Sequence, residues 1–123
     1  MERVLVTGAN RGIGLEYCRQ LHQRGDDVIA VCRQSSEELT QLDVRIESGI
    51  DLSCETDQSV LAKRLAGVEL ESVILNAGIL QTFGLDDLDP EGIRRQFEVN
   101  ALLLHWFLLV LCSTTCRLVA RLH

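Results

Sequence analysis

Short apolar runs recur along the chain, each long enough for a strand. Residues 4–6, 28–32 and 73–75 are continuous apolar runs with several β-branched side chains, as expected for parallel strands that are covered on both faces. From 44 to 50, apolar residues alternate with more polar ones, which predicts a strand with one less buried face. The chain therefore carries four predicted strands.

Amphipathic segments separate the first three of these strands. The first segment runs from a glycine-rich stretch to a stop at Arg24-Gly25 and has apolar residues at helical spacing on one face. Ser35 and Glu38 form an S-x-x-E capping box, which predicts a short helix over 36–42.

Two further helices are predicted after the third strand. Thr56 is expected to cap the first of them, which ends near Gly67. Asp89 and Pro90 suit the N-cap and the first position of the second. The apolar side chains assigned to these helices are Val60, Leu61, Leu65 and Val68 in one, and Ile93 and Phe97 in the other.

Strands and helices thus alternate from residue 4 to residue 75, which is typical of a parallel sheet with right-handed crossovers. We predict an α/β fold that is half of a three-layer, doubly wound sheet of the Rossmann type, with strands in the order 3-2-1-4. A chain of 123 residues has the size of one domain.

The pattern changes after Glu98, because no acidic residue follows it. Residues 101–112 are apolar at every position except His105. This run is shorter than the roughly 20 residues that span a bilayer, so we expect a buried helix at an interface rather than a membrane segment. Residues 101–123 form an atypical apolar tail, and a homo-oligomer is one expected consequence.

Composition and charge argue against several classes of protein. An apolar share of 46% is typical of a globular chain, and a formal charge of −6 with a single lysine, Lys63, argues against nucleic-acid binding. The start of the chain shows no long apolar segment of the signal-peptide kind, so we expect a cytoplasmic protein. Five scattered cysteines lack zinc-ligand spacing, so we expect no metal site and reduced thiols.

Residues 7–14, Thr-Gly-Ala-Asn-Arg-Gly-Ile-Gly, link the first predicted strand to the first predicted helix. Glycines there let the backbone turn tightly and approach a ligand closely, while the first turn of a helix offers N–H groups and a positive dipole end to an anion. This arrangement suits a pyrophosphate. A glycine-rich turn that holds no ligand is the alternative.

The T-G-x-x-x-G-I-G pattern resembles the cofactor motif of the short-chain dehydrogenase/reductase family, and Ala9-Asn10-Arg11 fits its carbonyl-reductase-like members. Three further features extend the resemblance up to about residue 100. These are Arg33 after the second predicted strand, Asp51-Leu52 after the third, and Asn76-Ala77-Gly78 after the fourth.

The resemblance implies a role for each of these residues. In such proteins the glycines of the motif hold the cofactor phosphates, and Asp51 would hydrogen-bond the adenine. Residues 76–78 would line the adenosine and nicotinamide side of the cleft. The cofactor-binding residues implied in this way are Gly8, Asn10, Arg11, Gly12, Ile13, Gly14, Arg33, Asp51, Leu52, Asn76, Ala77 and Gly78.

The end of the second predicted strand bears on the choice between NAD and NADP, because an acidic residue there accepts the ribose hydroxyls of NAD and repels a 2′-phosphate. This chain has Arg33 instead, and Arg11 in the glycine loop adds a second cation. A guanidinium offers two parallel hydrogen bonds to phosphate oxygens, so the sequence favours NADP over NAD. Two solvated surface charges are the alternative.

The resembling family moves a hydride between the nicotinamide and a carbonyl or alcohol, with a Tyr-x-x-x-Lys pair as the acid/base. Free tyrosine titrates near about 10 and needs the lysine to act at neutral pH. Here Leu21 stands four residues after Tyr17, the only tyrosine, and Lys63 belongs to another predicted helix. Asn100 matches the family's asparagine that supports a proton-relay water, or is a satisfied polar residue on a buried helix.

We therefore expect an NADP-dependent oxidoreductase by descent, truncated to its cofactor-binding half and inactive alone. Its completed form would act on a small-molecule carbonyl or alcohol. A second hypothesis is a non-catalytic nucleotide-binding or interaction protein that pairs through residues 101–112, and a membrane-associated tail is a third.

Overall fold

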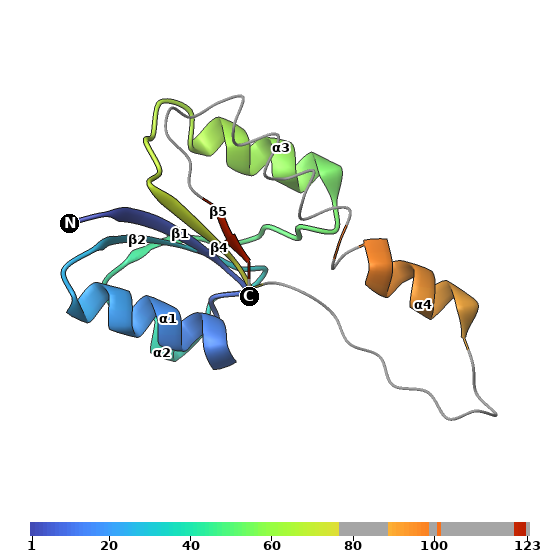
Figure 1. Ribbon diagram of the computed structural model, residues 1–123, viewed down its shortest axis with the longest axis horizontal. Coiled ribbons are helices and arrows are strands. Elements are labelled where there is room, and N and C mark those ends of the chain that lie inside the picture. The colour runs from blue at the N-terminus through green and yellow to red at the C-terminus, as the bar shows by residue number, and fades with distance from the viewer. Residues whose placement is uncertain (77–88, 99–100, 102–119, 123) are drawn as a thin grey trace.

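The computed structural model describes residues 1–76, 89–98, 101 and 120–122, and its centre is a five-stranded sheet whose paired strands are all parallel (Figure 1). The strand order is β3-β2-β1-β4-β5. This confirms the α/β fold and the predicted order 3-2-1-4, and it adds a strand at the edge beside β4 that the sequence pattern missed. The strands are β1 (Arg3–Thr7), β2 (Asp27–Val31), β3 (Arg45–Glu47), β4 (Ser72–Leu75) and β5 (Ala120–Leu122).

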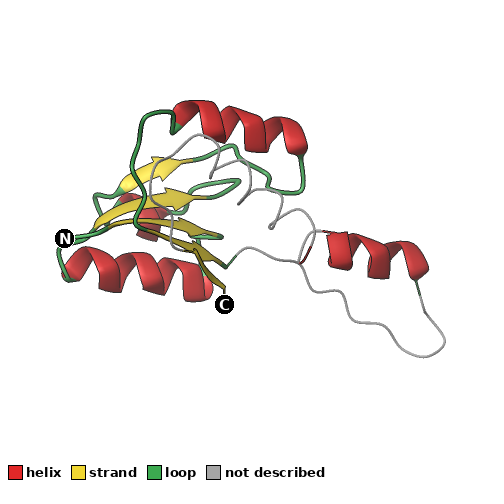
Figure 2. Cartoon of the chain, turned by 45° about the horizontal axis from the view of Figure 1, so that its top comes forward, coloured by secondary structure: helices red, strands yellow, loops and turns green. Residues whose placement is uncertain are grey.

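Helices cover both faces of this sheet (Figure 2). The helices α1 (Gly12–Gln23) and α2 (Glu37–Thr40) lie on one face, and α3 (Glu55–Arg64) lies on the other (Figure 1). The remaining helix, α4 (Pro90–Phe97), lies beyond the carboxyl ends of the strands (Figure 1). The carboxyl edge of the sheet is therefore the edge that α4 approaches.

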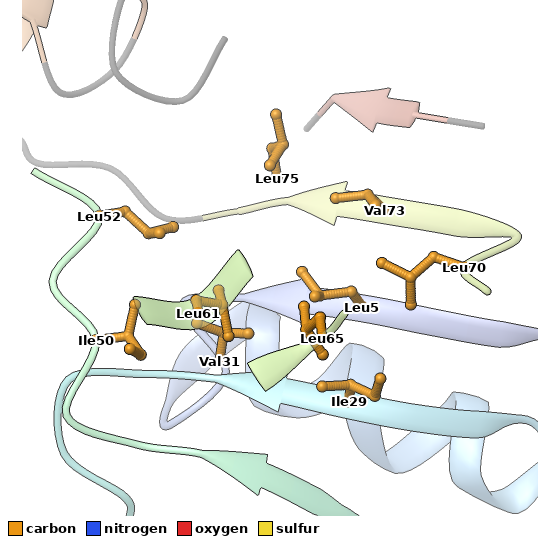
Figure 3. Packing of buried hydrophobic residues seen from close by; sticks show 10 residues of the cluster. All are labelled: Leu5, Ile29, Val31, Ile50, Leu52, Leu61, Leu65, Leu70, Val73 and Leu75. Atoms are coloured by element: carbon orange, nitrogen blue, oxygen red, sulfur yellow. The ribbon is translucent and has the colours of Figure 1, made fainter. Parts of the chain in front are cut away.

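Successive side chains of each central strand point to opposite faces and form two cores. Leu5, Ile29 and Val73, from three adjacent strands, pack with two fully buried residues, Leu61 of α3 and Leu65 at its C-cap (Figure 3). Burial on both faces is the reason that the apolar runs are continuous rather than alternating. The core on the other face contains Val4, Val6, Val28, Ala30 and Ile74 of the strands, together with Cys18 of α1 and Leu39 of α2.

The cap of α2 lies one residue later than the sequence indicated. The hydroxyl of Ser36, and not that of Ser35, accepts the first-turn hydrogen bond from the Leu39 N–H at 3.2 Å. With Ser36 as the N-cap residue, Leu39 is completely buried. Two neighbouring serines are equally good caps, so the packing of Leu39 in the core selects Ser36.

The third strand is shorter than the alternation of 44–50 predicted, and it spans only Arg45–Glu47. Gly49 has a φ of +74°, which turns the chain at this point. Ile46 packs against the core on the α1 side, whereas Ile50 is buried on the α3 side. The glycine thus ends the strand and redirects the apolar pattern to the opposite core.

The start of α3 also differs from the prediction. Cys54 is its N-cap residue and Thr56 is already inside the helix. The side chain of Asp57, in the first turn, accepts a hydrogen bond from the backbone N–H of Asp51 at 3.0 Å. The beginning of α3 is therefore tied to the loop after β3, which matters for the site described below.

The beginning of α4 agrees with the prediction, since Asp89 is the N-cap residue and Pro90 the first helical residue. The Asp89 side chain makes no capping hydrogen bond, and Ile93 and Phe97 are 49% and 60% exposed. The predicted apolar helix over 101–112 lies outside the described residues except at residue 101, so pairing through it stays a prediction.

Two further observations concern only the part of the chain that the structure describes. No helix in this part is long and apolar enough to cross a membrane, and no cluster of His, Cys, Asp or Glu in it could hold a metal ion.

Cys18, Cys32 and Cys54 are free thiols, and burial raises the pKa of Cys18 to about 12. Cys18 therefore stays protonated at neutral pH.

Candidate functional site

A cavity of about 690 Å³ lies at the carboxyl edge of the sheet, where the segments that follow β1, β2, β3 and β4 meet. The strand order reverses here, with β2 and β4 on either side of β1, and doubly wound sheets bind ligands at such a point. Most of the residues assigned to a cofactor from the sequence line this cavity: Gly8, Asn10, Arg11, Gly12, Arg33, Asp51, Leu52 and Asn76.

The three glycines at the junction of β1 and α1 are needed for two different reasons. Gly8 and Gly12 have φ values of +62° and +59°, in the left-handed region that other residues rarely adopt. Gly14 lies inside α1 with its backbone against the loop, and a Cβ there would lie 2.0 Å from the Gly8 carbonyl oxygen and 2.8 Å from the Asn76 Nδ2. The helix therefore packs directly on the loop.

Hydrogen bonds from both neighbouring strands hold this loop in place. The Thr7 hydroxyl accepts a hydrogen bond from the backbone N–H of Asn76 at 2.9 Å, which joins the end of β1 to the end of β4. The Asn76 side-chain amide donates to the Gly8 carbonyl at 3.5 Å. On the other side, the Ala9 N–H donates to the Val31 carbonyl of β2 at 3.2 Å. The loop is thus a fixed cradle.

The N-terminus of α1 lies at this cradle, and its residues Arg11 and Gly12 line the cavity. Its N-cap residue, Arg11, makes no side-chain capping bond, and its first turn carries no acidic residue. By contrast, α2, α3 and α4 each have an acidic residue in the first turn. The positive dipole end and the N–H groups of α1 therefore have no carboxylate from its own first turn, which suits a bound anion.

Asp51, in the loop after β3, has a fixed and ionised carboxylate. Its Oδ1 accepts hydrogen bonds from the Ser53 hydroxyl at 2.6 Å and from the Ser53 N–H at 2.9 Å. The Ser53 hydroxyl lowers the pKa of Asp51 most, and the nearby charges of Arg33 and Arg95 lower it further, whereas partial burial opposes the shift. Hydrogen bonding to Ser53 thus orients the carboxylate through Oδ1.

The pKa of Asp51 should rise in a Ser53→Ala variant, because the hydrogen bond that lowers it most is lost. Since the folded-state pKa lies below the ordinary value, the interaction stabilises the fold above that value and is lost as the pH falls through the folded pKa. A pH titration of the Asp51 carboxyl carbon by NMR measures the shift. Ser59→Ala, at an exposed position of α3, is the control, and an unchanged Asp51 pKa in Ser53→Ala would contradict this assignment.

Uncompensated positive charge gathers at the cavity. Arg11, Arg33 and Arg95 line it and form no ion pair with any described residue. The only carboxylate among the described lining residues is that of Asp51. In a chain with a formal charge of −6, this cavity is therefore positive. The other arginines with described side chains each pair with a carboxylate: Arg3, Arg19, Arg24, Arg45, Arg64 and Arg94.

Some predicted residues do not reach the cavity. Ile13 is 68% exposed and does not line it, while 77–78 and Asn100 lie outside the described residues. Tyr17 lies on α1 and Lys63 on α3, on opposite faces of the sheet (Figure 1). They cannot act together as an acid/base pair.

Sequence reasoning missed several lining residues. Cys32 and Gln34 could have been predicted, because they flank Arg33 in the sequence. Ser53 could have been predicted too, because it comes two residues after Asp51 and a serine often forms a hydrogen bond with a nearby aspartate. Arg95 had no local signal, because it lies on a separate helix. The missed residues are Val31, Cys32, Gln34, Ile50, Ser53 and Arg95.

A larger hollow of about 840 Å³ lies along α4, but its described lining comes from α4 and the residue that follows it. No residue of the glycine loop reaches it. We place the candidate site in the smaller cavity, because four loops and the N-terminus of α1 converge there.

Known proteins resemble this chain in sequence. The family described as short chain dehydrogenase matches residues 2–109. The 1-hydroxy-2-glutathionyl-2-methyl-3-butene dehydrogenase of Rhodococcus sp. (strain AD45) is 40% identical over 104 residues, which cover 83% of this chain and 46% of that protein. L-xylulose reductase of Caenorhabditis elegans is 33% identical over 107 residues, which cover 80% and 42%. The chain thus spans about half the length of the curated relatives it matches.

Solved structures agree with these sequence matches. A carbonyl reductase from Pseudomonas aeruginosa PAO1 superposes with a TM-score of 0.80 at 28% identity, over 98% of this chain and 58% of that one. A protein from Burkholderia multivorans, solved with bound NADP, superposes with a TM-score of 0.82 at 25% identity, over 94% and 54%. Both the fold and the glycine-loop half of the domain are shared.

Proposed function

The chain belongs to the short-chain dehydrogenase family, and on that premise we propose that its cavity binds NADP(H) as the cofactor-binding part of an oxidoreductase. Members of this family use NAD or NADP, and one structural neighbour carries bound NADP. The observation that carries the choice of NADP is the presence of two guanidinium groups, Arg11 and Arg33, that line the cavity and form no ion pair with a described residue.

The described residues suit the adenosine and pyrophosphate part of this cofactor. The glycine cradle and the open N-terminus of α1 suit the pyrophosphate. The fixed Asp51 carboxylate suits an amino group such as that of adenine, because Ser53 already occupies one of its oxygens. Arg33, at the end of β2, stands where an acidic residue would repel a 2′-phosphate.

When bound, the nicotinamide would supply or accept a hydride, and a small-molecule carbonyl or alcohol would be its reaction partner. Proton transfer at the substrate oxygen needs an acid/base group close to that oxygen. Tyr17 and Lys63 lie on opposite faces of the sheet and neither lines the cavity. We propose that the 123 residues bind the cofactor without themselves carrying out hydride transfer.

The test is a titration of the purified chain with NADPH and with NADH, followed by nicotinamide fluorescence. We expect NADPH to bind more tightly by roughly tenfold or more, since a charge-assisted contact to the 2′-phosphate is worth about 1.5–3 kcal/mol. A carbonyl substrate added to the same sample should leave the NADPH absorbance unchanged. Equal affinities would contradict the choice of NADP, absence of binding would contradict the site, and robust NADPH consumption would contradict inactivity.

A further inference from the structure

Arg95 is the one described residue of α4 that lines the cavity. The other described lining residues come from the ends of β1, β2, β3 and β4, from the loops that follow them and from the first residue of α1. Arg95 and Arg33 therefore approach the same cavity from two different elements, and the charges of both lower the pKa of Asp51. Arg95 is thus placed at the Asp51 end of the cavity.

The neighbouring arginine on the same helix behaves differently. Arg94 pairs with Glu91 at 2.8 Å one turn earlier, its side chain is 75% exposed, and it does not line this cavity. Arg95 has no ion-pair partner among the described residues. Both arginines are exposed and both line the hollow along α4, but only Arg95 also lines the candidate cavity.

Three guanidinium groups and one carboxylate, that of Asp51, are the charged groups among the described residues that line this cavity. Like charges that share a cavity repel each other, and a bound anion between Arg33 and Arg95 would offset this repulsion. A phosphate monoester, with about −1.5 to −2 charge at neutral pH and three acceptor oxygens, satisfies two guanidinium groups at once. The diester phosphates of a pyrophosphate belong at the cradle of α1 instead.

We propose that Arg95 is a specificity-determining residue, whose guanidinium joins that of Arg33 in binding the 2′-phosphate of the cofactor. This inference rests on the proposed binding of NADP(H). It assigns to α4 a part in cofactor choice that the glycine motif and the β2 end do not account for. The structural reason is that α4 approaches the carboxyl edge of the sheet, where Arg33 and Asp51 lie.

The experiment compares the wild-type chain, Arg95→Gln and Arg94→Gln. The two variants remove one equal charge from adjacent positions, so long-range electrostatic effects cancel. Each is titrated with NADPH and NADH, and also with 2′,5′-ADP and 5′-AMP, which differ only in the 2′-phosphate. Circular dichroism checks that all three chains are folded to the same extent.

We expect Arg95→Gln to weaken NADPH and 2′,5′-ADP binding by roughly tenfold, and to leave NADH and 5′-AMP within about twofold of wild type. Arg94→Gln should match wild type with every ligand. Wild-type affinity of Arg95→Gln for NADPH, or an equal loss for all four ligands, would overturn the role of Arg95 and leave the proposed function standing. If the wild-type chain binds no ligand, the proposed function and this inference both fail.

Discussion

Gly14→Ala should lower the free energy of unfolding by roughly 2 kcal/mol or more and abolish measurable NADPH binding. Gly14 is inside α1, where alanine in place of glycine would ordinarily stabilise a helix by up to about 1 kcal/mol. Here the added Cβ would lie 2.0 Å from the Gly8 carbonyl oxygen, and backbone cannot swing aside as the end of a flexible side chain can. The N-terminus of α1 must therefore move away from the cradle.

Urea denaturation followed by circular dichroism measures the stability, and nicotinamide fluorescence measures the binding. Gly67→Ala is the matched control, because Gly67 has a φ of +78°, has open space around its Cβ position and lies after α3, away from the cavity. It should cost about 1 kcal/mol of backbone strain and leave NADPH binding intact. Wild-type stability and affinity in Gly14→Ala would show that α1 does not need this close contact.

The central fold could be predicted because its signal is local. The apolar runs 4–6, 28–32 and 73–75 are continuous because the sheet is covered on both faces. In the structure their side chains are buried in the cores on both faces of the sheet. The details that failed depend on distant packing. Burial of Leu39 selects Ser36 over Ser35 as a cap, and the short strand β5 pairs with β4, a partner far away in the sequence. Such choices cannot be read from neighbouring residues.

The site residues also divide into those with a local sequence signal and those whose position depends on distant packing. Gly8, Gly12 and Asp51 lie within five residues after a strand, so the carboxyl ends of parallel strands bring them to the same edge of the sheet. Arg95 comes from a helix whose position depends on packing beyond the β–α units, and its charge is unremarkable beside Arg94. Only the structure separates the two, through the Glu91 ion pair of one and the cavity position of the other. The cofactor roles of all these residues stay predictions.

Arg33→Asp should reverse the cofactor preference. The substitution removes a charge-assisted contact worth about 1.5–3 kcal/mol and sets a carboxylate against a 2′-phosphate, so NADPH should bind on the order of a hundredfold more weakly. The same carboxylate can accept hydrogen bonds from the ribose hydroxyls of NADH, whose affinity should hold or increase. Fluorescence titrations with both cofactors measure the two affinities.

The controls separate this local effect from a change in overall charge. Arg19→Asp alters the net charge by the same amount on the exposed surface of α1, where Arg19 pairs with Glu16 outside the cavity, and should leave both affinities near wild type. Arg33→Lys keeps the charge but loses the planar two-donor geometry, so it should retain part of the NADPH affinity. If Arg33→Asp and Arg19→Asp weaken NADPH equally, the long-range field of the chain selects the cofactor. If Arg33→Asp alone does so, the selection is made by contact at the end of β2.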